Sequence, residues 1–155
     1  MMEIKKYPHS QVTMLPGDIL YSPIGKSTYF VGHIVIIGAD LHVKESLPTN
    51  LSGHSATIEQ FWQRHRMGDT ITLFRSIIGS KLAAKWAQTY VKDVKKYYLG
   101  NHDINNITQN YCSKFVMQAY YFGANIELGN RLDRLITPQA LIRSPLLRKL
   151  VIFKR

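Results

Sequence analysis

The stretch FVGHIVIIGADLHVKES, residues 30–46, decides the fold that the sequence predicts. Residues 29–38 are apolar on both faces, which is typical of a central strand buried within a sheet. Residues 40–46 alternate between the two faces of a strand, and Glu45 falls on the face that also carries Leu and Val side chains. With a three-residue turn at 38–40, the two strands form an antiparallel hairpin.

This hairpin brings a histidine and a carboxylate together. In the register that best matches apolar with apolar positions, the opposed pairs are Ile37 with Leu41, Val35 with Val43, and His33 with Glu45. Directly opposed residues have Cβ atoms roughly 4.5–5.5 Å apart, so Glu45 can hold the His33 imidazole by one ring nitrogen. A buried carboxylate is costly unless it is paired, and His33 is its natural partner. A slip by one residue would separate the two side chains, so this prediction depends on register.

The remaining pattern predicts an α+β fold with an antiparallel sheet, because strands come mostly first and helices are interspersed later. Further strands are expected at 17–22, 69–76 and 149–154, and helices at 57–65, 81–100, 112–123 and within 137–143. Residues 47–56 and 101–110 are expected to be loops. Thr57 and Gln60 have the spacing of a capping box at a helix start. The longest helix carries an apolar stripe formed by Leu82, Trp86, Tyr90, Val94 and Tyr97.

The composition is that of a globular protein, with 45% hydrophobic and 19% charged residues in a chain of 155. We predict a single domain over residues 1–155, because no linker, repeat or low-complexity segment is evident. The sequence has neither a recognisable signal peptide nor an apolar run of membrane-spanning length, which predicts a cytoplasmic protein. The single cysteine excludes an internal disulfide, so no disulfide partner is expected.

The net charge of +10 attracts anions, and nucleic acid, an anionic membrane surface and acidic substrates are the classes it favours. No zinc finger, RNA-binding aromatic signature or basic heptad array is present, so nucleic acid is a disfavoured partner. Five lysines lie on the polar side of the helix expected at 81–100. A solvated helix face therefore accounts for much of the positive charge.

The single cysteine, Cys112, lies in NYCSKFVMQAYYFG, residues 110–123, where it opens a predicted helix on the core-facing side. A helix N-terminus stabilises a thiolate through its dipole and its free N–H groups, and a neighbouring imidazolium lowers the thiol pKa further. The same N–H groups can stabilise an oxyanion. A thiolate at a helix start, opposite a histidine oriented by Glu45, is the arrangement that nucleophilic acyl transfer requires.

Each of these residues also has a purely structural interpretation. A lone cysteine on an apolar helix face is commonly a small core residue. A histidine in a buried strand is commonly a hydrogen-bonded core residue, and Glu45 near a strand end can point to water. The residue pattern by itself leaves packing and chemistry open as alternatives.

Four segments, taken in order, carry a family resemblance: LPGDILYS (15–22), GHIVIIG (32–38), HVKES (42–46) and YCSKFV (111–116). Together they resemble the permuted papain-like amidases, the YiiX-like branch of the NlpC-type cysteine peptidase superfamily. Ordinary papain-type enzymes present their residues in the order Cys, His, polar. This chain presents His33, Glu45, Cys112, which matches the circularly permuted order.

The resemblance covers about residues 15–125 and implies a permuted papain-like fold, in which an antiparallel sheet or half-barrel packs against helices. It implies a thiol protease or amidase that acts on a small peptide or amide, of cell-wall type, with no metal or organic cofactor. The roles it assigns by position are nucleophile for Cys112, base for His33, third member of the catalytic triad for Glu45, substrate contact for Tyr111 and a structural role at the turn for Asp18. Lys114 stands where the family pattern favours an acidic residue, which implies different local substrate contacts.

Three other functions remain as alternatives. Proteins of the lecithin retinol acyltransferase group share the permuted order and transfer or hydrolyse lipid acyl groups, and the basic surface would suit an anionic membrane. A non-enzymatic basic domain would bind an acidic partner in a salt-sensitive way and keep an inert thiol. A metal site is disfavoured, because the six histidines show no HExxH or comparable spacing.

Overall fold

The computed structural model describes residues 4–23, 32–48 and 52–155, and shows a mixed α+β fold built on an antiparallel sheet. The sheet has six strands in the order β4-β3-β2-β1-β5-β8. Their bounds are Ile19–Ser22 for β1, His33–Ile37 for β2, Val43–Ser46 for β3, Gly53–Ala56 for β4, Thr70–Ser76 for β5 and Leu147–Lys154 for β8. A short parallel pair joins β6, Lys96–Tyr97, to β7, Gln109–Asn110.

The helices are α1 at Ile58–Gln63, α2 at Ser80–Tyr90, α3 at Cys112–Ala124 and α4 at Pro138–Ile142, with one 3₁₀ turn at Val91–Asp93. The helices predicted within 57–65, 112–123 and 137–143 are therefore confirmed, as are the strands predicted at 17–22, 69–76 and 149–154. The predicted capping box is also confirmed, since Thr57 and Gln60 exchange both of its hydrogen bonds at the start of α1.

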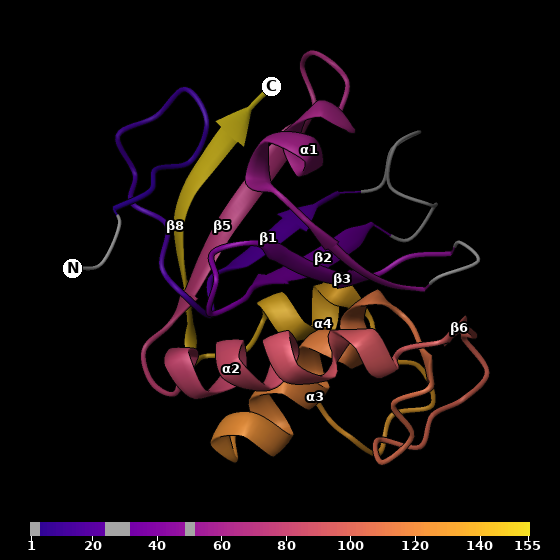
Figure 1. The fold of residues 1–155 in the computed structure, drawn as a ribbon. Helices are drawn as coiled ribbons and strands as arrows, with labels where there is room; N and C mark the ends of the chain where they lie inside the picture. The colour runs from indigo at the N-terminus through magenta and orange to yellow at the C-terminus, as the bar shows by residue number, and fades with distance from the viewer. Residues whose placement is uncertain (1–3, 24–31, 49–51) are drawn as a thin grey trace.

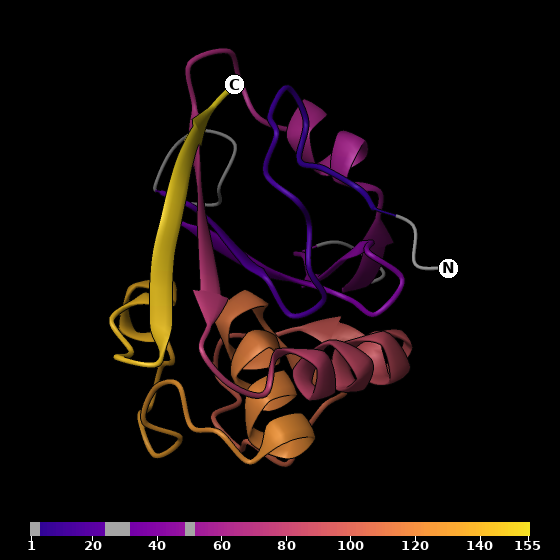
Figure 2. The same cartoon turned by 90° about the vertical axis from the view of Figure 1, so that its left-hand side faces the viewer.

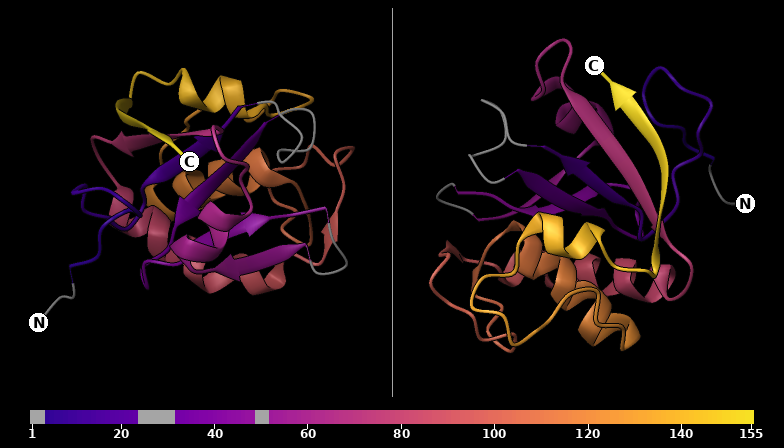
Figure 3. Two further views of the ribbon diagram at one scale, coloured as in Figure 1. Left: turned by 90° about the horizontal axis from the view of Figure 1, so that it is seen from above. Right: turned by 180° about the vertical axis from the view of Figure 1, so that it is seen from behind.

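The sheet separates two groups of elements. Helix α1 lies on one face of the sheet, and α2, α3 and α4 lie on the other (Figures 1 and 2). Figure 3 shows α4 beside α3 on that second side. Strand β2 is buried throughout and supplies both cores, with Ile34 and Ile36 facing the α3 side and Val35 and Ile37 facing the α1 side. Helix α3 is thereby packed against the middle of the sheet, with its first residue near the start of β2, where His33 lies.

Helices α2 and α3 approach closely because small residues face each other. Ala83, Ala84 and Ala87 are the buried side chains of α2. A Cβ added to Gly123 of α3 would lie 2.7 Å from the Leu82 carbonyl oxygen, so only glycine fits there. Leu82 itself is 57% exposed, so the apolar stripe expected on this helix is wrong at that position. The alanines form the buried face because they allow the close helix contact.

The hairpin of β2 and β3 has a different register from the one expected. Val43 lies opposite Ile37 rather than Val35, because the turn extends from Gly38 to His42. Two backbone hydrogen bonds close this longer turn, with the Gly38 N–H donating to the His42 carbonyl at 2.8 Å and the Leu41 N–H donating to Gly38 at 3.0 Å. A shift of two residues leaves every side chain on its original face, since the strand period is two. His33 and the β3 carboxylate therefore remain on one face, as diagonal neighbours.

Two further expectations are wrong. Residues 53–56, expected to be part of a loop, form strand β4, which pairs with β3. The rest of that predicted loop includes 49–51, which lie outside the described residues. The helix expected over 81–100 ends at Tyr90, because the Val94 carbonyl accepts a hydrogen bond from the Gly53 N–H at 3.0 Å and the next N–H groups donate to Thr108. These tertiary hydrogen bonds hold the backbone of 94–97 in an extended form, so Val94 is buried and Tyr97 is partly buried without being helical.

Asp18 is buried at the start of β1 and holds the turn before it. Its carboxylate accepts a hydrogen bond from the Leu15 N–H at 3.0 Å and from the Tyr7 hydroxyl at 2.7 Å. Arg75 on β5 adds an ion pair with N–O distances of 2.7 and 2.9 Å. The structure thus places Asp18 in a network that joins the N-terminal segment to the sheet.

We expect Asp18→Ala to lower the free energy of unfolding by at least about 2 kcal/mol, because it leaves the buried Tyr7 hydroxyl without its acceptor. Urea denaturation followed by circular dichroism measures the change. The control is Asp133→Ala, at an exposed loop position, which should stay within about 0.5 kcal/mol of the parent protein. Equal losses in the two variants would contradict a specific role of the Asp18 network.

Candidate active site

Cys112 is the first residue of α3, and its side chain lies at a helix N-terminus. The N-cap residue, Tyr111, has an extended backbone and contributes no side-chain cap. The start of an α-helix leaves its first N–H groups without intrahelical partners, which favours a negative charge there. Cys112 is 4% exposed, and its thiol interacts with the His33 side chain, the Ile34 backbone and Ser113.

His33 lies between the thiol and a carboxylate. Its Nε2 is 2.8 Å from Oε1 of Glu45, and its ring also interacts with the side chain of Cys112. The Glu45 contact survives the register shift because diagonal neighbours on one sheet face are within reach of long side chains. The structure therefore brings together the three residues that the sequence analysis assigned as nucleophile, base and third member.

Glu45 is fully buried and is held by three cationic or polar side chains. His54 on β4 approaches its Oε2 with Nδ1 at 3.0 Å, and Nη2 of Arg64 donates to the same oxygen at 2.5 Å. Burial alone would raise the pKa of this carboxyl, but the hydrogen bonds to His33 and His54 and the charge of Arg64 hold the pKa of Glu45 well below its usual range. Glu45 is thus an anion at neutral pH, ready to stabilise a positive charge on His33.

The thiol and the imidazole shift each other's pKa in the directions that favour an ion pair. Burial acts to lower the pKa of His33, but its hydrogen bonds to Cys112 and Glu45 outweigh that effect and raise the pKa from 6.5 to about 9. Burial acts to raise the pKa of Cys112, yet the hydrogen bond and charge of His33 and the Ile34 N–H lower it below its ordinary value. Both shifts act in the direction that favours a thiolate beside an imidazolium.

His65, which follows α1, is a buried neutral neighbour of this group. Its Nδ1–H donates to the Phe61 carbonyl at 2.9 Å, and its Nε2 accepts from the Ser22 hydroxyl at 2.6 Å. Burial lowers the pKa of His65, and the nearby charges of Arg64 and His33 lower it further. An uncharged His65 avoids placing a second buried cation beside His33.

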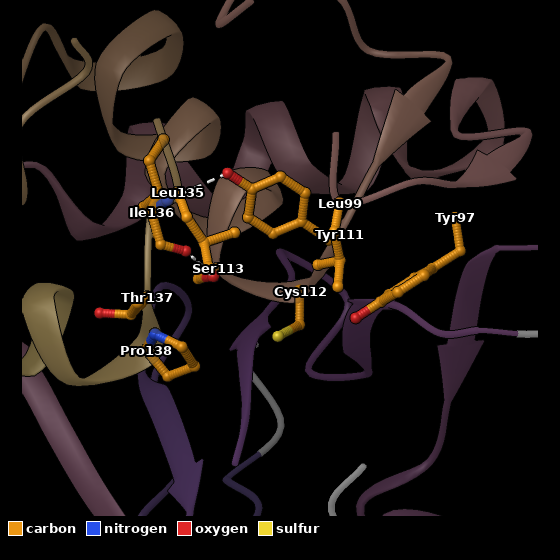
Figure 4. A pocket seen from close by; sticks show the side chains of 9 residues that line it. All are labelled: Tyr97, Leu99, Tyr111, Cys112, Ser113, Leu135, Ile136, Thr137 and Pro138. Atoms are coloured by element: carbon orange, nitrogen blue, oxygen red, sulfur yellow. Dashed lines mark hydrogen bonds between the residues drawn. The ribbon is translucent and has the colours of Figure 1, made fainter. Parts of the chain in front are cut away.

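A pocket opens directly above the thiol. Figure 4 shows its two walls, with Tyr97 and Leu99 on one side of Cys112 and residues 135–138, which lead into α4, on the other. The full lining consists of Tyr97, Leu99, Tyr111, Cys112, Ser113, Leu135, Ile136, Thr137 and Pro138. No described residue with a charged side chain is among these, so the site beside the thiol has mainly apolar walls.

Tyr111 and Lys114 flank the nucleophile in different ways. Tyr111 is 1% exposed and accepts a hydrogen bond from the Ile136 N–H at 3.1 Å, so its hydroxyl fixes the wall of the pocket while its ring lines it. Lys114 donates to the Gln109 carbonyl at 2.9 Å and is absent from the pocket lining. Burial lowers the pKa of Lys114 to about 8. The departure from the family pattern at Lys114 therefore falls away from the thiol.

Two partners of Glu45 were missed by the sequence analysis. His54 lies directly opposite Glu45 in the β3–β4 pairing, so recognising that second hairpin would have identified it. Arg64 caps the C-terminus of α1, and nothing in its sequence position indicates that the helix faces β3. Only the packing of α1 on the sheet reveals this contact.

In the described ranges, no three His, Cys, Asp or Glu side chains are grouped so that they could hold a metal ion. Within the same ranges, no helix combines the length and the apolar character needed to cross a membrane.

Comparison with known proteins identifies a solved structure with a similar fold. No protein-family model and no curated protein sequence matches this chain. The structure is similar to the solved structure of the metalloprotein YiiX from Escherichia coli, with a TM-score of 0.55 and 13% sequence identity, over 90% of this chain and 98% of that one. The chain therefore has a YiiX-like fold, in which an antiparallel sheet packs against helices. At this level of identity the similarity shows the fold alone.

Proposed function

We propose that this protein is a cysteine hydrolase of the permuted papain-like, NlpC-type kind, which cleaves an amide bond through an acyl-enzyme on Cys112. The observation that carries the proposal is the position of His33, whose Nε2 lies 2.8 Å from Oε1 of the buried Glu45 and whose interaction with Cys112 raises the pKa of the imidazole and lowers the pKa of the thiol. A thiol, a base and a group that orients the base are what nucleophilic acyl transfer needs. The YiiX-like fold supports a papain-like hydrolase as the class.

The first half of the reaction forms a thioester. The Cys112 thiolate attacks the carbonyl carbon of the substrate, forming a C–S bond and a tetrahedral oxyanion. The N–H groups in the first turn of α3 are suitably placed donors for that oxyanion. The intermediate collapses with cleavage of the C–N bond, and the imidazolium of His33 gives its proton to the leaving amine.

The second half regenerates the thiolate. Neutral His33 takes a proton from water, and the resulting hydroxide equivalent attacks the thioester carbonyl. The C–S bond breaks, the acid product leaves, and Cys112 again pairs with protonated His33. Glu45 keeps one ring nitrogen of His33 engaged through both halves, so the imidazole does not rotate away from the reacting atoms.

The metalloprotein description of YiiX raises the question of a metal in this chain. The described residues offer no group of three suitable ligands. The Glu45 oxygens, which would be natural donors, are already engaged by His33, His54 and Arg64. The described residues therefore do not fit a metal, and the proposed reaction uses none.

The pH dependence of Cys112 alkylation tests this proposal. An ordinary thiol with a pKa of about 8.5 is only about 1% thiolate at pH 6.5, whereas the paired thiol should remain largely ionised. We expect fast alkylation by iodoacetamide at pH 6.5 and a decrease of roughly tenfold or more in the alkylation rate of His33→Ala.

The pKa of His33 near 9 further predicts that hydrolysis declines above about pH 9, where the imidazolium loses its proton.

The matched control is His42→Ala, at a half-exposed side chain in the turn before β3, which should label like the parent protein. Because Cys112 is the only thiol in the chain, every labelled molecule reports on it. A thiol that reacts only after denaturation would refute the proposed nucleophile.

A further inference from the structure

The pocket beside Cys112 can bind only one of the two parts of the substrate, the acyl group or the leaving amine. The leaving amine must reach His33, because His33 supplies its proton. His33 and Glu45 are not part of the pocket lining, although Cys112 is. The group that projects into the pocket is therefore the acyl portion, which stays on the sulfur after the amine departs.

The chemistry of the walls restricts that acyl portion. The side chains of Leu99, Leu135, Ile136 and Pro138 present only hydrocarbon, and the oxygen of the Tyr111 hydroxyl accepts a hydrogen bond from the Ile136 N–H. A charged group placed there would lose its hydration without gaining an opposite charge from the described lining residues. Hydrocarbon placed there would gain affinity in proportion to the area that it buries.

The rim of the pocket is also apolar and partly uncovered. Leu99 is 43% exposed and Leu135 is 44% exposed, and they stand on opposite walls. An acyl chain lying between them would remove both side chains from water, which a small polar acyl group cannot do. Leu99 and Leu135 are thus placed to contact a bound acyl chain from both sides.

We infer that this pocket is an acyl-binding subsite that selects uncharged, apolar acyl groups and rejects acyl groups that carry a carboxylate. The inference rests on the proposed function and adds the substrate class to it. It disfavours an anionic cell-wall-type peptide on the acyl side of the bond. The leaving-group side, beside His33, is left unrestricted by this pocket.

A series of p-nitrophenyl esters measures the selectivity. We expect kcat/KM to rise roughly threefold per added methylene from acetate through butyrate to hexanoate. The anionic hemiglutarate ester, which matches butyrate in bulk near the carbonyl, should be at least about tenfold slower than butyrate. A flat series, or a preference for hemiglutarate, would overturn the subsite.

A pair of variants locates the effect. Leu135→Asp places a carboxylate in the wall and should abolish the chain-length dependence, whereas Leu135→Lys should favour the hemiglutarate ester. Leu150→Asp is the matched control, because Leu150 is also 44% exposed but lies on β8, away from the pocket lining. Equal effects of Leu135→Asp and Leu150→Asp would mean that the change is not local, and would refute the assignment.

Direct labelling separates this inference from the proposed function. Alkylation of Cys112 by N-hexyl-iodoacetamide should be faster than alkylation by iodoacetamide and much faster than alkylation by iodoacetate, even if no ester is turned over. Equal rates for the three reagents, combined with His33-dependent reactivity, would refute the subsite and leave the nucleophile standing. A hexyl preference that is independent of His33 would support the subsite and refute the proposed catalytic pair.

Discussion

Replacing Cys112 by alanine is expected to abolish hydrolysis, with a loss on the order of 10⁴-fold or more in kcat, because no other group can form the acyl-enzyme. The thiol is small and buried at the helix start, so alanine should fit the same space. Initial rates with an activated ester, measured alongside the melting temperature, give both quantities. Cys112→Ser adds a stricter comparison, because a serine hydroxyl lacks the low pKa that the paired thiol has.

The fold of the Cys112 variant must remain intact for this result to be informative. A melting temperature within a few degrees of the parent and an unchanged circular dichroism spectrum establish that. Retention of more than about a tenth of the activity would identify a different nucleophile, since loss of an essential nucleophile costs far more than tenfold. A large loss of activity in a folded Cys112→Ala protein is the expected result.

Replacing Glu45 by leucine is expected to destabilise the protein by about 3 kcal/mol, since breaking a buried ion pair leaves its partner uncompensated. The main cost falls on His33, which is 5% exposed, because Arg64 and His54 can turn toward water. For a chain of this length the change corresponds to a melting temperature lower by roughly 6–12 °C. Thermal unfolding at pH 7 measures it.

The pH dependence of that loss has a definite sign. The pKa of Glu45 is depressed in the folded protein, so its contribution to stability is present above its ordinary pKa of 4.5 and is lost as the pH falls through the folded value. The difference in the free energy of unfolding between the parent protein and Glu45→Leu should therefore shrink in acid.

The control is Glu59→Leu on α1, whose side chain is 56% exposed and forms an ion pair only with Lys5 among the described residues. It should change stability by no more than about 1 kcal/mol, and an equal loss in both variants would contradict the role of the Glu45 cluster.

Local sequence signals predicted most of the elements. The capping box at Thr57 and Gln60 located the start of α1, and the helix expected within 137–143 is α4. The continuous apolar run of β2 indicated a strand buried on both faces, which it is. These signals act within a few residues of one another, so they are readable without the rest of the chain.

The secondary-structure predictions were wrong where hydrogen bonds to distant backbone groups override the local preference of the sequence for helix or loop. Helix α2 ends at Tyr90 because β4 and the segment near Thr108 hydrogen-bond the residues that follow, although the apolar spacing continues to Tyr97. Strand β4 has a polar sequence and is formed by pairing with β3 rather than by its own propensity. Neither hydrogen-bonding partner is visible from the local pattern.

The sequence by itself determined that His33 and Glu45 share one face of a hairpin, because the strand period of two preserves that relation even in a register shifted by two residues. It also determined that Cys112 begins a helix. Only the tertiary structure decided that this helix start meets the start of β2, that Arg64 and His54 hold Glu45, and that apolar side chains line the pocket beside the thiol. The physical reason is that hairpin and helix geometry depend on neighbouring residues, whereas the packing of α1 and α3 on opposite faces depends on burial across the whole sheet.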